Sequence, residues 1–243
     1  EAQTEELLKE EFPEAIVSLS SEIAPEFREY LRASTTVINA ALTPIVGRYL
    51  TSIEKRLKSS GLSSELLVMQ SNGGVLTFGA ASDKPVFMVE SGPAAGVIAA
   101  SYLGNTLGSP NVLSFDIGGT TAKTGLVRKG TPTITKDYEV GVAAGGTGTG
   151  VQGAGYPIRT PVIDLVEIGA GGGSIAWVDS GGILRVAPQS AGADPGPVCY
   201  GRGGEEPTIT DANLVLGRLD PEYFLGGKMK LDVEGARKAI ELK

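Results

Sequence analysis

VLSFDIGGTTAK, at residues 112–123, is an apolar run broken by an acid, two glycines and two threonines. The apolar residues predict two strands, Val112 to Phe115 and Ala122 to Val127, with Gly118-Gly119 in the turn between them. Because glycine lacks a Cβ, backbone N–H groups in the turn can approach phosphate oxygens, and the threonines add hydroxyl donors. Asp116, at the end of the first strand, can hold a hydrated Mg²⁺. The pattern predicts a phosphate-binding hairpin, with an ordinary Gly-Gly hairpin as the open alternative.

The composition limits the function classes. With 243 residues, 41% of them hydrophobic, the chain can bury a core as one large domain or two smaller lobes. The net charge of -7 argues against a nucleic-acid partner, and no apolar run reaches membrane-spanning length. The chain has no histidine, so it cannot assemble a Ser-His-Asp triad or a Cys-His zinc site. Its single cysteine, Cys199, cannot form an internal disulfide, and we expect a reducing, cytoplasmic setting.

Two further segments could carry chemistry. Residues 90–100 form a small-residue run that predicts a helix beginning at Pro93, suited either to a hinge between lobes or to a closely packed core. Residues 169–174 read GAGGGS after an apolar strand and could donate backbone N–H groups to a phosphate or a carboxylate. They lack the spacing of a dinucleotide fingerprint and the lysine of a P-loop, so a plain glycine-rich turn is equally compatible. Cys199 has apolar neighbours, which predicts a packed, unreactive thiol.

Hydrophobic periodicity and turn residues predict the remaining elements. One amphipathic helix spans Ile38 to Leu57. Pro44 either kinks this helix or, as we favour, opens its second part, with Thr43 as N-cap and Pro44 at the first position. The glycine-rich residues 141–155 predict a loop that is either mobile or in contact with a ligand. The other expected elements are a helix at 5–11, strands at 15–19, 85–89, 161–168 and 175–178, a hairpin turning at Asn72-Gly73, a helix capped by Asp211, and an amphipathic helix from Val233.

The order of these motifs resembles the second half of the actin-like ATPase superfamily. Within it, the chain is similar to the hydantoinase A/5-oxoprolinase family. The residues that carry the resemblance are RASTTVINA (32–40), MQSNGG (69–74), ESGPAAG (90–96), DIGGTT (116–121), IGAGGGSIA (168–176), SAGADPGP (190–197), YGRGG (200–204) and TDAN (210–213).

The resemblance implies an α/β, ribonuclease H-like fold in partial form, with a mixed sheet flanked by helices. Residues 1–90 would be the end of the N-terminal lobe with its linking helix and strands. Residues 91–243 would be a second-lobe portion, in which Ser91 to Gly104 is the connecting helix and Asp116 to Thr121 the second phosphate loop. Only one Asp-x-Gly-Gly-Thr loop occurs, so we expect a central fragment of the family's proteins.

The resemblance also implies ATP-dependent opening of a cyclic amide, such as a hydantoin or 5-oxoproline, together with a hydantoinase B-like second subunit or domain. The expected cofactors are ATP and Mg²⁺, with Asp116 as catalytic and metal-binding residue. The expected phosphate- or nucleotide-binding residues are Gly118, Gly119, Thr120, Thr121, Gly171, Gly172, Gly173 and Ser174. Where such loops often read Thr-Asp, this one reads Ala122-Lys123, and Lys123 could meet a phosphate or an acidic neighbour. The alternatives are an acetone-carboxylase-like, ATP-dependent carboxylase subunit and a non-enzymatic nucleotide switch.

Overall fold

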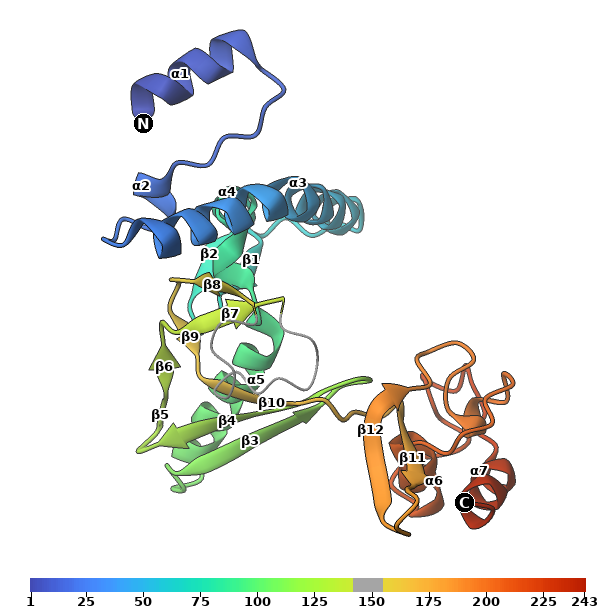
Figure 1. Cartoon of the computed structure of the whole chain (residues 1–243). Helices are drawn as coiled ribbons and strands as arrows, with labels where there is room; N and C mark the ends of the chain where they lie inside the picture. The colour runs from blue at the N-terminus through green and yellow to red at the C-terminus, as the bar shows by residue number, and fades with distance from the viewer. Residues whose placement is uncertain (142–154) are drawn as a thin grey trace. The chain divides into compact units, whose positions relative to one another are not determined.

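The computed structural model describes residues 1–141 and 155–243 (Figure 1). The predicted glycine-rich loop therefore lies almost entirely outside the described residues. The chain divides into two compact units. Among the described residues, the first comprises Glu1–Ser114, 124–141 and 155–166, and the second comprises Phe115–Lys123 and Glu167–Lys243. The assignment of residues 1–90 and 91–243 to two lobes stays a prediction.

The long helix of the first unit is continuous. Helix α3 (Glu29–Ser59) has 31 residues and runs through Pro44, so the predicted restart there is wrong. Thr43 does not cap a second helix, because its Oγ1 donates to the carbonyl oxygen of Asn39, one turn earlier, at 2.8 Å. The helix buries Thr35, Asn39 and Leu50, whereas Ile45 and Tyr49 of the predicted apolar face are 58% and 61% exposed.

Hydrogen bonds explain which side of α3 is buried. The Asn39 amide donates to the carbonyl oxygen of Asp83 at 3.0 Å and accepts from the Val86 N–H at 3.3 Å. Thr35 Oγ1 accepts from the Arg159 N–H at 3.0 Å. A buried backbone group needs a partner, so these polar contacts select the buried side more strongly than the apolar stripe does.

Two short apolar runs were wrongly predicted as strands. Residues 15–19 form no strand, and Ile16 is 49% exposed as the chain passes from α1 (Ala2–Glu11) to α2 (Ser20–Ile23). Residues 85–88 form the 3₁₀ helix η1 (Pro85–Met88), whose Phe87 carbonyl accepts from the N–H and the hydroxyl of Ser71. Short apolar runs do not distinguish strand from helix by periodicity alone.

The predicted hairpin at Asn72-Gly73 is confirmed. Strand β1 (Leu67–Met69) pairs antiparallel with β2 (Val75–Thr77), and α4 (Phe78–Asp83) follows. Gly73 has φ +85°, a conformation that favours glycine, and Asn72 Oδ1 accepts from the Gly74 N–H at 2.8 Å.

Helix α5 (Ser91–Thr106) packs on the main sheet, as the small-residue run predicts (Figure 1). The sheet has the order β10 (Leu165–Ile168), β4 (Ala122–Arg128), β3 (Val112–Ile117), and β5 (Thr131–Pro132) also pairs with β4. Their shared core contains Ala94, Val97 and Val127. A Cβ on Gly125 would collide with Val97, so glycine permits this approach of strand to helix. The helix begins at Ser91 after a left-handed Glu90, so Pro93 is its third residue and not its first.

Short strand pairs complete the first unit. Strand β6 (Ile134–Thr135) pairs with β9 (Val162–Ile163), and β7 (Tyr138–Val140) pairs with β8 (Tyr156–Ile158). The strand predicted at 161–168 is divided into β9 and β10 at Asp164, whose N–H donates to the carbonyl oxygen of Thr133 at 2.9 Å.

The second unit contains one hairpin and short helices. Strand β11 (Ser174–Val178) pairs antiparallel with β12 (Leu184–Ser190). The segments η2 (Val198–Tyr200), α6 (Ile209–Val215) and α7 (Val233–Glu241) enclose a core that includes Cys199, Leu214 and Ala236. Among the helices formed by residues 1–141 and 155–243, none is long and apolar enough to cross a membrane.

Asp211 does not cap α6 as predicted. The N-cap is Thr208, whose Oγ1 accepts from the Asp211 N–H, while the Asp211 carboxylate accepts from the Thr208 N–H at 2.8 Å. Asp211 is fully buried, and its carboxylate also accepts from the Thr208 hydroxyl and from the N–H groups of Val198 and Cys199. This reciprocal capping box ties the start of α6 to η2.

Candidate functional site

The Gly-Gly turn joins β3 to β4 as the sequence predicts. Strand β3 ends at Ile117 and β4 begins at Ala122, and the Gly118 N–H donates to the carbonyl oxygen of Thr121 at 2.8 Å. Within the described part of the chain, the N–H groups of Gly119, Thr120 and Thr121 donate no hydrogen bond. The turn is largely exposed, so these donors can meet a ligand.

The glycine run lies directly against this turn. The Gly172 N–H donates to the carbonyl oxygen of Gly118 at 2.9 Å, and the Gly173 N–H donates to that of Gly119 at 2.7 Å. The Gly171 N–H donates to Ser174 Oγ and the Ser174 N–H to the carbonyl oxygen of Gly171, both at 2.9 Å. All four N–H groups of residues 171–174 are therefore bonded within the protein. The nucleotide contact predicted for these residues stays a prediction.

These contacts fix the direction of the free donors. In a trans peptide unit the C=O and the following N–H point in opposite directions. The carbonyl groups of Gly118 and Gly119 face the glycine run, since they accept from it. The N–H groups of Gly119 and Thr120 belong to the same two peptide units and therefore point away from the run. Two successive N–H groups on one side of a turn are a geometry that binds anions.

Asp116 is exposed beside the turn, and its carboxylate accepts no hydrogen bond from the described residues. Among these residues, no group of three Asp, Glu, Cys or His side chains could hold a metal ion. Mg²⁺ often binds one or two carboxylates and takes its remaining ligands from phosphates and water. A lone carboxylate next to free N–H donors thus fits Mg²⁺ bound together with a phosphate ligand, and does not fit a metal cage made by this chain alone.

Lys123 has an acidic neighbour. Its Nζ lies 3.8 Å from Glu167 Oε1, and only 16% of the lysine side chain is exposed. Lys123 was predicted to meet either a phosphate or an acidic neighbour, and the Glu167 carboxylate is such an acidic neighbour. The lysine at this position compensates a charge on β10 and anchors the start of β4.

Thr210 belongs to the same hydrogen-bonded network and was not among the predicted site residues. Both its N–H and its Oγ1 donate to the carbonyl oxygen of Gly172, at 2.9 and 2.8 Å. A signal was present, because Thr210 opens the TDAN motif that supports the family resemblance. Its connection to the Gly-Gly turn runs through the main-chain groups of Gly172 and Gly173 and leaves no pattern in the sequence.

Cys199 is a packed thiol, as predicted. It is fully buried, and this burial, reinforced by the nearby Asp211 carboxylate, raises the pKa of the thiol far above its usual range. A thiol that stays protonated is a poor nucleophile, so Cys199 belongs to the core of the second unit.

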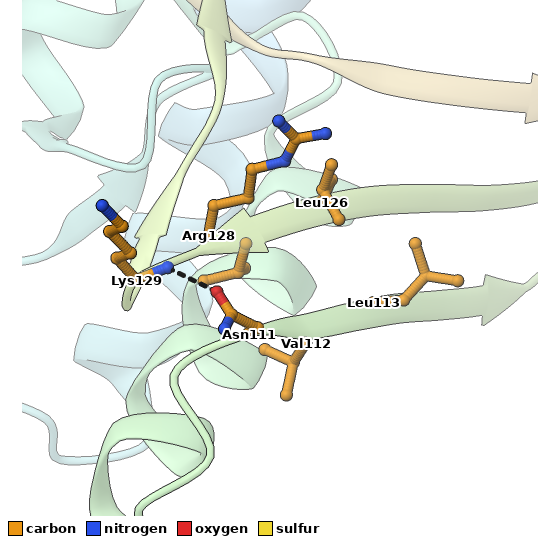
Figure 2. Close-up of a pocket in the computed structure, with 7 residues that line it drawn as sticks. Asn111, Val112, Leu113, Leu126, Arg128 and Lys129 are labelled. Carbon is orange, nitrogen blue, oxygen red and sulfur yellow. Dashed lines mark hydrogen bonds between the residues drawn. The ribbon is translucent and has the colours of Figure 1, made fainter.

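A depression of about 420 Å³ lies where β3 begins and β4 ends, away from the turn. Figure 2 shows its lining residues, among which the Lys129 N–H donates to Asn111 Oδ1 at 2.9 Å. The other lining residues are Val112, Leu113, Leu126, Val127 and Arg128. None of the predicted site residues lines this depression, so the site rests on the geometry of the turn.

Comparison with known proteins identifies the context of these motifs. A family model described as Hydantoinase/oxoprolinase matches residues 32–243. The chain is 50% identical over 242 residues to an uncharacterized protein of Methanocaldococcus jannaschii, covering 99% of this chain and 35% of that protein. It is 39% identical over 237 residues to the caprolactamase subunit alpha of Pseudomonas jessenii (98% and 32% covered). It is 40% identical over 212 residues to the 5-oxoprolinase of Saccharomyces cerevisiae (86% and 15% covered).

Two solved structures share the fold. The crystal structure of the ATP-dependent caprolactamase from Pseudomonas jessenii matches with a TM-score of 0.72 and 37% identity, covering 99% of this chain and 33% of that one. A nucleotide-free structure of acetone carboxylase, an enzyme of ATP-dependent acetone carboxylation, matches with a TM-score of 0.71 and 32% identity, covering 92% and 30%. The predicted α/β, actin-like ATPase fold is confirmed, and the chain spans about a third of the length of the first relatives it matches.

Proposed function

The chain belongs to the hydantoinase/oxoprolinase family, and on this premise we propose that it supplies one phosphate loop of an ATP-dependent cyclic-amide hydrolase. The observation that carries the proposal is the pair of N–H groups, on Gly119 and Thr120, that point away from the glycine run. The relatives support the substrate class, because 5-oxoproline and caprolactam are both cyclic amides. A hydantoin or 5-oxoproline is the expected substrate.

We assign the roles as follows. Gly119, Thr120 and Thr121 hold phosphate oxygens through backbone N–H groups and hydroxyls. Gly118, predicted with them, uses its own N–H to close the turn onto the Thr121 carbonyl oxygen. Asp116 holds Mg²⁺ or orients a water molecule. ATP, when bound, supplies phosphorylation of the amide oxygen, which makes an otherwise resistant amide a better electrophile. The glycine run at 171–174 contributes by keeping the turn in this conformation.

The wider setting follows from the same premise. One relative is named as a subunit, caprolactamase subunit alpha, and we propose a hydantoinase B-like partner subunit or domain for this protein. The single cysteine fits a cytoplasmic setting. The family resemblance implies two phosphate loops, one from each lobe, and residues 1–243 contain one Asp-x-Gly-Gly-Thr loop. We therefore expect this chain alone to bind Mg-ATP weakly. Calorimetry that detects tight Mg-ATP binding by residues 1–243 would contradict this expectation.

The decisive experiment is Asp116→Asn in the full natural protein, measured as ATP turnover with a cyclic amide present. We expect a loss of about 100-fold or more, the size of effect seen when a group that stabilises transition-state charge is removed. Asp137→Asn is the matched control, because the Asp137 carboxylate pairs with Arg159 at the surface of the first unit. Turnover that is equal in Asp116→Asn and the control would remove Asp116 from the mechanism.

A second candidate is an ATP-dependent carboxylase subunit, which the structural match to acetone carboxylase favours. Product analysis separates the two functions, since a hydrolase releases the ring-opened acid whereas a carboxylase incorporates labelled bicarbonate. If neither cyclic amides nor ketones accelerate phosphate release, the protein is better described as a nucleotide switch.

A further inference from the structure

We propose that Thr210 is a positioning residue that orients the phosphate loop through a relay of hydrogen bonds ending at the Thr120 N–H. The inference rests on the proposed role of residues 118–121 in holding phosphate. Both hydrogen-bond donors of Thr210 go to Gly172 and not to the loop itself, so its effect passes through two peptide groups.

The relay follows from the donors and acceptors. Thr210 N–H and Oγ1 both donate to the carbonyl oxygen of Gly172. The N–H on the opposite side of that peptide unit belongs to Gly173, and it donates to the carbonyl oxygen of Gly119 at 2.7 Å. The N–H on the opposite side of the next peptide unit belongs to Thr120, which donates to no group within the described residues. The two peptide dipoles are thus aligned, with the free N–H at the open end.

Alignment strengthens that free donor. Hydrogen bonds in a chain polarise one another, so a carbonyl that accepts two bonds makes the N–H of the same peptide unit a better donor. The Gly172 carbonyl oxygen accepts two hydrogen bonds, and both donors belong to Thr210. Loss of the Thr210 hydroxyl would therefore weaken the relay and allow the 172–173 peptide unit to rotate.

The backbone of Thr210, where the relay begins, is fixed by hydrogen bonds of its neighbours. Thr210 is preceded by the N-cap Thr208 and Ile209 and is followed by Asp211, whose buried carboxylate accepts from the Thr208 hydroxyl and from three backbone N–H groups. These bonds fix the backbone of residue 210, and only its side chain adds the second donor to Gly172. A conservative change at Thr210 can therefore alter the relay without unfolding α6.

The test compares Thr210→Val with Thr210→Ser in the full natural protein. Valine keeps the shape and removes the hydroxyl, and serine keeps the hydroxyl. Thr106→Val is the matched control, because Thr106 Oγ1 donates to the carbonyl oxygen of Tyr102 on the exposed side of α5. The first readout is amide hydrogen exchange in the ligand-free protein, on peptides covering 115–123 and 168–175. The second is the dissociation constant for Mg-ATP.

We expect Thr210→Val to accelerate exchange at residues 118–121 and 172–173 about three- to tenfold, the factor that corresponds to one hydrogen bond. Mg-ATP affinity should fall by a similar factor while kcat changes less than about twofold, and Thr210→Ser and Thr106→Val should behave as the unmodified protein. If exchange in Thr210→Val is unchanged, or rises equally across α6, α7 and β11, the inference is wrong. Thr210→Ala replaces the valine variant if the latter does not fold.

These outcomes are separate from the proposed function. If cyclic amides fail to stimulate ATP hydrolysis, the hydrolase assignment falls, but the exchange comparison still decides whether Thr210 orients the loop. If the unmodified protein binds no Mg-ATP, residues 118–121 do not hold its phosphates. Thr210 then has no role in ligand binding, and the inference is overturned.

Discussion

Gly171→Ala tests whether the glycine run at 171–174 must lie in contact with the turn at 118–121. A Cβ at this position would lie 2.6 Å from the Thr120 nitrogen and 2.7 Å from the Gly118 carbonyl oxygen. Both are backbone atoms, so no change of rotamer can make room, and the loop or the run must move. Overpacking of this kind costs about 1–3 kcal/mol. The movement also strains the bonds from Gly172 and Gly173 to the loop, each worth about 1 kcal/mol.

We therefore expect the free energy of unfolding of the second unit to fall by about 2–4 kcal/mol. Trp177 is the single tryptophan of the chain and lies in β11, so its fluorescence during urea denaturation reports on this unit. Gly119→Ala is the control in the same unit, because nothing lies within 4 Å of its missing Cβ and its φ is not positive. Alanine there should be neutral or stabilising by up to about 1 kcal/mol. A Gly171→Ala chain within about 0.5 kcal/mol of the original would refute the packing argument.

Three further substitutions probe the two cores. Burial, with the nearby Asp211 carboxylate, raises the pKa of Cys199, so the folded thiol stays protonated when the unfolded thiol ionises near pH 8.5. The stability that Cys199 supplies is then fully present below that pH and is lost above it by about 1.4 kcal/mol per pH unit. In urea titrations from pH 8 to 10, the free energy of unfolding should therefore fall less steeply with pH in Cys199→Ala than in the unmodified protein. Asp211→Asn should cost about 3 kcal/mol or more, measured beside the exposed control Asp220→Asn, because the carboxylate accepts four hydrogen bonds, three of them buried. Asn39→Leu should cost about 2–4 kcal/mol and accelerate exchange of the Val86 N–H, its present donor.

Local patterns were sufficient for the elements around the turn. The hairpin of β3 and β4 was predictable because two apolar runs flank a Gly-Gly pair, and α5 was predictable because its small residues form a continuous run. The same reasoning failed at residues 15–19 and 85–89, where five residues are too few for periodicity to choose a structure. It also failed at Pro44, where α3 continues through the proline and Thr43 donates back to Asn39 instead of capping a second helix.

The chemistry of the site was only partly readable from the sequence. Residue types at 116–121 favour phosphate contacts but are also compatible with an ordinary Gly-Gly hairpin. The contact between residues 118–119 and 172–173 joins main-chain groups over 50 positions apart, and any residue but proline carries those groups. Sequence patterning could therefore suggest that both glycine segments matter, but could not distinguish a segment that meets the ligand from one that holds the other in place.

The space around each glycine makes that distinction. At Gly171 the missing Cβ would meet the protein's own backbone, so glycine is needed there for the run to reach the loop. At Gly119 nothing lies within 4 Å of the missing Cβ, and no positive φ calls for glycine there. Folding therefore does not explain glycine at position 119, whereas it fully explains glycine at position 171. Next to the unfilled space at Gly119 is the Thr120 N–H, which has no partner among the described residues. A phosphate that approaches the turn would need both this space and this donor.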